Sequence, residues 1–104
     1  MHSSKRKRLE AAGWAVGDAG NFLQLEPDER AYIELRLRLA EGLRTRRNRK
    51  RLTQVDLAEA IQSSQSRVAK MESGDPSVSI DLLVKSLLAL GTSRRELADI
   101  IAAR

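Results

Sequence analysis

From residue 27 onward, the hydrophobic positions of the chain recur at helical spacing. Pro27 suits the first turn of a helix, and the acidic residues Asp28 and Glu29 complement the positive end of its dipole. Apolar residues then fall in two stripes, which are Leu35, Leu39 and Leu43, and Ile33, Leu37 and Ala40. Two stripes indicate burial against two surfaces. The pattern predicts one long helix over 27–50.

Four shorter helices are predicted downstream, because a good N-cap residue precedes each remaining apolar run. These caps are Thr53, Ser64, Ser79 and Ser93, and the first and last have an acidic residue three positions later, as in a capping box. Gly74 and Gly91 supply the left-handed residues that end helices. No segment alternates between apolar and polar residues as a strand does. We therefore predict an all-α fold of five helices.

The first quarter of the chain has no regular pattern and predicts an irregular N-terminal extension, 1–26, before a domain over 27–104. It contains Trp14 and Phe22, two of the three aromatic residues of the chain. These side chains either pack on the long helix as an accessory core or anchor a partner protein. We favour the accessory core.

Charge favours an anionic partner. The net charge is +5 and the sequence pI is about 10.2, which is typical of proteins that bind nucleic acid or an acidic membrane surface. Six cations lie within positions 44–51. The alternative for this cluster is a solvated helix end, where cations complement the negative end of the dipole.

Several classes of protein are disfavoured. The chain has no cysteine, which excludes disulfides and thiolate metal sites and fits the reducing cytoplasm. No apolar run approaches a membrane span. The lone histidine, His2, adjoins the initiator Met, and the carboxylates near Glu26 suit a helix start. We predict no enzyme, no cofactor and no metal.

Two short helices, over 53–61 and 64–73, are separated by a tight turn, which is the arrangement of a helix-turn-helix. On a helical wheel of the second helix, Val68 and Met71 face inward, whereas Ser66 and Lys70 face outward and Gln65 lies at the tip. Glutamine can pair with adenine, lysine can donate to guanine, and serine can bond either way. The alternative is an ordinary solvated helix face.

From about residue 39 to residue 97 the chain resembles the Cro/repressor-type (XRE) helix-turn-helix family. The run Leu-Thr-Gln-x-x-Leu-Ala from Leu52 carries the resemblance, together with a second helix ending Glu-x-Gly at Gly74 and a Leu-Gly helix end at Gly91. The resemblance implies a five-helix lambda-repressor-like domain. It further implies a DNA-binding transcriptional regulator, read here as a repressor that binds a double-stranded DNA operator as a homodimer.

Site residues follow from the resemblance position by position. Gln54 matches a residue that caps the first helix of the motif against a phosphate, and Arg47 and Glu72 match a buried or half-buried ion pair. The base-contacting or edge positions, with the N-cap before them, are Ser64, Gln65, Ser66, Arg67 and Lys70. Arg49 is expected to contact phosphate as an exposed member of the basic cluster.

Two features depart from the core pattern. Gln62 stands in the turn where the family often has glycine, and a positive φ there would cost about 1 kcal/mol. The N-terminal extension resembles that of HigA-type antitoxins, so the alternative function is an antitoxin that binds a toxin protein. For the homodimer, the sequence predicts an interface at the apolar stripe near Ile100, with the stripe containing Leu35 and Leu39 as the alternative.

Overall fold

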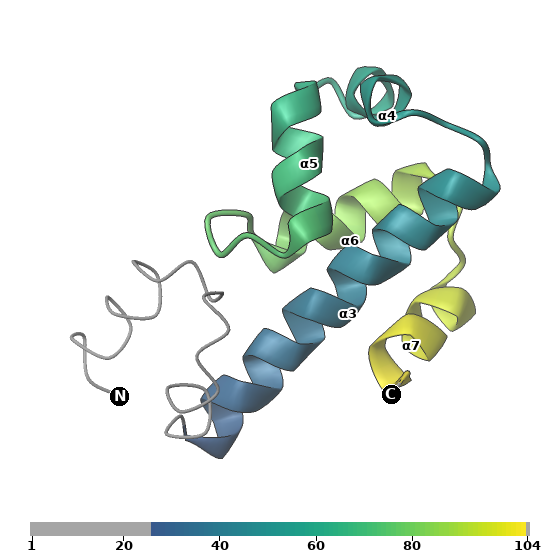
Figure 1. Ribbon diagram of the computed structural model, residues 1–104. Coiled ribbons are helices and arrows are strands. Elements are labelled where there is room, and N and C mark those ends of the chain that lie inside the picture. Colours follow the sequence, from purple (N-terminus) through teal and green to yellow (C-terminus); the bar gives the residue numbers. More distant parts are fainter. Residues whose placement is uncertain (1–25, 104) are drawn as a thin grey trace.

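A computed structural model describes residues 26–103, which contain five helices and no strand. They are α3 (Pro27–Arg49), α4 (Gln54–Ala60), α5 (Gln65–Ser73), α6 (Ile80–Ala89) and α7 (Arg94–Ala102) (Figure 1). The predicted all-α, five-helix class is confirmed. The extension, with Trp14 and Phe22, lies outside the described residues, so the boundary at residue 27 stays a prediction.

Each predicted N-cap forms as expected. Side-chain oxygens of the four caps accept hydrogen bonds from backbone N–H groups in the first turns of α4 to α7; the caps are Thr53, Ser64, Ser79 and Ser93. The carboxylates of Asp56 and Glu96 in turn accept hydrogen bonds from the backbone N–H groups of Thr53 and Ser93, which completes two capping boxes. Gly74 ends α5 at a φ of 75°. The local sequence therefore sets where these helices begin and end.

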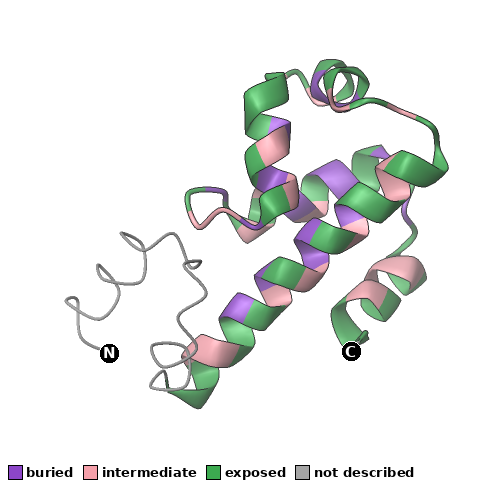
Figure 2. Cartoon of the chain, in the orientation of Figure 1, coloured by how far each residue is buried: buried purple, intermediate pink, exposed green. Residues whose placement is uncertain are grey.

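Helix α3 is the axis on which the other helices pack. In Figure 1 the pair α4 and α5 lies on one side of α3 and α7 on the other, while α6 crosses it. One core joins the carboxyl-terminal half of α3 to α4, α5 and α6 (Figure 2), with fully buried side chains at Leu39, Leu43, Leu57, Val68, Met71, Leu83 and Leu87. Hydrophobic burial in this core fixes the orientation of the helix-turn-helix pair.

Both predicted stripes of α3 contribute buried residues. Leu39 and Leu43 are core residues, as their stripe predicts, whereas Leu37 in the second stripe is 45% exposed. Ile33 and Ala40 of the same stripe are 4% and 2% exposed, so at Leu37 the second surface that the stripes predict stays a prediction. Since Leu39 is buried within its own chain, it is also unavailable to a dimer interface.

Helix α7 buries less of its surface than the other described helices. None of its residues is buried, and its contact with α3 centres on Ile100, which packs against Gly42. A Cβ atom at Gly42 would lie 2.8 Å from Cγ2 of Ile100, so only glycine allows this approach. The Arg46–Glu96 ion pair, at 2.6 Å, is the second attachment.

Candidate nucleic-acid interface

The turn between α4 and α5 places the second helix of the motif. Gln62 adopts a φ of 55°, so the left-handed conformation whose cost the sequence raised is present. The backbone N–H of Ser63 donates to the carbonyl of Ala58 at 2.8 Å and closes the turn. The turn therefore keeps its left-handed residue without glycine, at a strain of about 1 kcal/mol.

Helix α5 divides into a buried and an exposed face. Val68 and Met71 are fully buried, which anchors the helix on the core. The exposed face carries Gln65, Ser66, Arg67, Lys70 and Ser73. Ser64 caps the helix by accepting a bond from the Arg67 N–H at 3.2 Å, and its hydroxyl lies 3.3 Å from that of Ser66. The tip of α5 is therefore polar and ordered by its own cap.

Arg47 and Glu72 are brought together between α3 and the end of α5. Arg47 Nε and Nη2 donate to the two carboxylate oxygens at 2.5 and 3.0 Å, and Nη1 donates to the carbonyl of Leu52 at 2.7 Å. The side chains are only 12% and 5% exposed. The hydrogen bond to Glu72 raises the pKa of Arg47. This bidentate pair clamps α5 to α3.

A chain of hydrogen bonds extends from this ion pair to the tip of α5. Gln54 Nε2 donates to Glu72 Oε1 at 3.1 Å, and Gln65 Nε2 donates to Gln54 Oε1 at 3.0 Å. The cap of α4 itself is Thr53, and Gln54 is the first helical residue. Sequence reasoning identified these residues but missed the link between them, because contacts between the tips of two helices depend on the angle of the turn.

The basic cluster does not share one face. Arg47 turns to α5, Arg46 turns to Glu96 of α7, and Arg49 lines the groove between α3 and α7. Arg44 lines a different groove, beside Ser73 at the end of α5. Lys50 and Arg51 are exposed where α3 leads into α4, and Arg51 has a φ of 58° that the sequence did not indicate. Two of these cations therefore hold the fold together.

Within residues 26–103, no three His, Cys, Asp or Glu side chains gather as a metal would need. None of the described helices combines the length and apolar character that crossing a membrane requires.

Comparison with known proteins gives one match. A family model described as helix-turn-helix matches residues 43–97, more than half of the chain, from the end of α3 into α7. No curated protein and no solved structure matches the chain.

Proposed function

The chain belongs to the helix-turn-helix family of DNA-binding transcription regulators, of the Cro/repressor (XRE) type, and from this we propose that it is a repressor that reads operator DNA with α5. It acts in the cytoplasm as a homodimer on two half-sites. The observation that carries the proposal is the exposed polar tip of α5, tied through Gln54 to the Arg47–Glu72 pair.

The exposed face of α5 suits the major groove. Its side chains beyond the core contacts are polar or cationic, and Ser66 and Ser73 are small enough for close approach. Gln65, Ser66 and Lys70 are the proposed base contacts, with Arg67 at the edge of the face contacting base or phosphate. Gln54 and Ser64, at the starts of the two helices, are the proposed contacts with the phosphate backbone.

The hydrogen-bond chain supports a specific base preference. The Glu72 carboxylate can only accept, so the Gln54 amide turns its NH₂ toward Glu72 and its oxygen toward Gln65. Gln65 then donates one hydrogen to Gln54, which leaves its Oε1 and its second N–H for a base. One acceptor beside one donor matches N6 and N7 of adenine. We therefore propose that Gln65 reads adenine.

Dimerisation is proposed from the size of the reading surface. A single short recognition helix contacts few base pairs, and proteins of this architecture gain selectivity by binding two half-sites about one helical turn apart. The exposed cations of the 44–51 cluster, Arg49 included, would add affinity for phosphate without selectivity.

The alternative from the sequence, an antitoxin that binds a toxin protein, depends on Trp14 and Phe22. Both lie outside the described residues, so this alternative stays a prediction. DNA reading is supported by the geometry of described residues, and repression at an operator is the function we propose for it.

Selection of bound sequences from random duplex DNA tests the proposal. We expect an enriched half-site, in inverted repeat, with adenine at one position. Gln65→Ala should lose the preference for adenine there, at about 1–3 kcal/mol of discrimination, and should bind random DNA nearly as the wild type does.

Lys85→Ala is the matched control, because Lys85 is exposed on α6, outside the motif. It should return the wild-type sequence. Recovery of no enriched sequence by the wild-type protein would refute operator reading. Unchanged selectivity in Gln65→Ala would refute the assigned reading face.

A further inference from the structure

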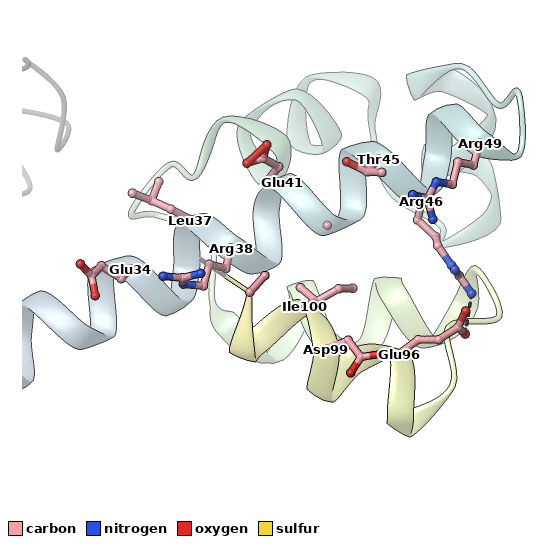
Figure 3. A pocket seen from close by; sticks show the side chains of 12 residues that line it. Glu34, Leu37, Arg38, Glu41, Thr45, Arg46, Arg49, Glu96, Asp99 and Ile100 are labelled. Atoms are coloured by element: carbon pink, nitrogen blue, oxygen red, sulfur yellow. Dashed lines mark hydrogen bonds and ion pairs between the residues drawn. The ribbon is translucent and has the colours of Figure 1, made fainter.

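A groove of about 660 Å³ runs between α3 and α7. Figure 3 shows α3 along one side and α7 along the other, with the Arg46–Glu96 pair at one end. Its apolar lining includes Leu37, Gly42 and Ile100. The Arg47–Glu72 clamp lies on a different face of α3, toward α5. The groove is therefore open to a partner while α5 is engaged elsewhere.

Helix α7 is incomplete as a packed element. It has nine residues and none of them is buried. Helices this short are unstable in isolation and depend on packing. Yet Ile101 remains 44% exposed, and Leu37 across the groove remains 45% exposed. Further apolar burial on this face would stabilise α7 where its own chain leaves it uncovered.

The charges along the α3 side of the groove alternate in sign. Glu34, Arg38 and Glu41 are spaced four and three residues apart and line the groove together. Within residues 26–103 none of these three makes an ion pair. The stripe of Glu34, Arg38 and Glu41 therefore has the charge order negative, positive, negative, and each of these charges is available to a partner.

We propose that this face binds a second copy of the chain, with the α3 helices antiparallel across a twofold axis and α7 beside them. The inference rests on the homodimer of the proposed function and assigns its interface. Such a contact uses the same patch on both subunits, so the patch must be complementary to itself. An acid–base–acid stripe meets this condition when the axis lies between its arginine and one of its glutamates.

The register follows from the spacing of the charges. If the axis passes between Glu34 and Arg38, each arginine meets the other copy's Glu34. If it passes between Arg38 and Glu41, each arginine meets the other copy's Glu41. These two pairings need the axis at the midpoint of each glutamate–arginine pair, whereas an axis through any of the three charged residues, or midway between Glu34 and Glu41, opposes like charges. The charges thus set the orientation, while Leu37, Ile100 and Ile101 supply the apolar area.

Sedimentation over a concentration series without DNA tests the interface with two complementary variants. Arg38→Glu makes the stripe wholly acidic, and Glu34→Arg/Glu41→Arg makes it wholly basic. The wild type should dimerise, and each variant alone should show a dissociation constant raised by at least about tenfold. An equimolar mixture of the two variants should associate again.

The controls separate charge from folding and from DNA reading. Arg38→Lys keeps the charge and should dimerise, as should the reversed exposed pair Asp81→Lys/Lys85→Asp on α6. Dimers of Arg38→Glu alone, a wholly monomeric wild type, or a mixture that fails to associate would each overturn the proposal. On duplexes with one half-site, Arg38→Glu should keep wild-type base preference. Lost operator reading with an intact dimer would instead count against the proposed function alone.

Discussion

At the scale of single residues, Glu72 is the most connected side chain of the helix-turn-helix. It accepts bonds from Arg47 and Gln54 and is 5% exposed on its side chain. Glu72→Ala would strand the Arg47 guanidinium, which is 12% exposed, and should lower the free energy of unfolding by about 3 kcal/mol. Denaturant unfolding measures this cost.

The matched comparison is Asp81→Ala. Asp81 pairs with Lys85 at 3.2 Å, but the two side chains are 73% and 71% exposed, so its loss should cost under about 1 kcal/mol. Equal effects of the two substitutions would contradict a structural role for the Arg47–Glu72 pair.

At the scale of helices, the start of α7 should make stability depend on pH. The backbone N–H of Ser93 and then the Arg46 guanidinium lower the pKa of Glu96 from its ordinary value of 4.5. A carboxyl whose pKa is lowered by folding stabilises the folded state fully above the unfolded value, and this contribution disappears as pH falls through the folded pKa. The melting temperature should therefore decrease as the pH is lowered below about 4.5.

Glu96→Gln isolates this contribution, because the amide keeps the shape of the side chain without its titration. The variant should melt lower than the wild type at pH 7, and the gap should narrow toward pH 3. Asp56, whose pKa is lowered by bonds from Thr53, continues to titrate in both proteins. A gap that stays constant with pH would exclude Glu96 as the source.

The spacing between α3 and α7 is set by Gly42. Alanine is preferred over glycine within a helix by about 1 kcal/mol, but a Cβ here would lie 2.8 Å from Ile100 Cγ2. Overpacking of this kind costs about 1–3 kcal/mol, so Gly42→Ala should be net destabilising. In an Ile100→Ala background the clash is gone, and the same substitution should stabilise by about 1 kcal/mol.

Denaturant unfolding of the two single variants and the double variant measures this change of sign. Additive effects would mean that Gly42 and Ile100 do not set the spacing.

At the scale of the whole molecule, DNA affinity and DNA selectivity should respond differently to salt. Each phosphate neutralised contributes about 0.9 to the slope of log affinity against log salt on duplex DNA. Arg49→Ala should lower the slope by about one unit and weaken half-site and random duplexes alike. Lys85→Ala, exposed on α6 outside the motif, should leave the slope unchanged. Equal slopes for the wild type and Arg49→Ala would remove Arg49 from the phosphate contacts.

The sequence predicted most of the fold because its signals are local. Caps such as Ser64 and Ser93, and the glycine after α5, mark helix ends within a few residues of chain. The positive φ of Gln62 was also predictable, since the turn of the motif demands it. The similar conformation of Arg51 was not, because nothing in its neighbours requires it.

What the sequence could not supply is the relation between helices. The division of the basic cluster among α5, α7 and solvent depends on how α3 is rotated in the fold, and neighbouring residues point about 100° apart on a helix. Adjacent arginines 46 and 47 consequently hold different helices. The link from Glu72 through Gln54 to Gln65 likewise needs the crossing of α4 and α5, which no spacing in the sequence records.

Helix α3 contacts α5 with one face and α7 with another, so the two surfaces can change independently during evolution. Substitutions on α5 can change the operator while the α7 side is untouched, and substitutions along the Glu34–Glu41 stripe can change the pairing partner while the operator stays the same. After duplication of the gene, a change in the operator or a change in the pairing partner is each sufficient to separate the functions of the two products. Complementary sign changes, at Arg38 in one product and at Glu34 and Glu41 in the other, would make the two products pair with each other rather than with themselves while both still bind the same DNA.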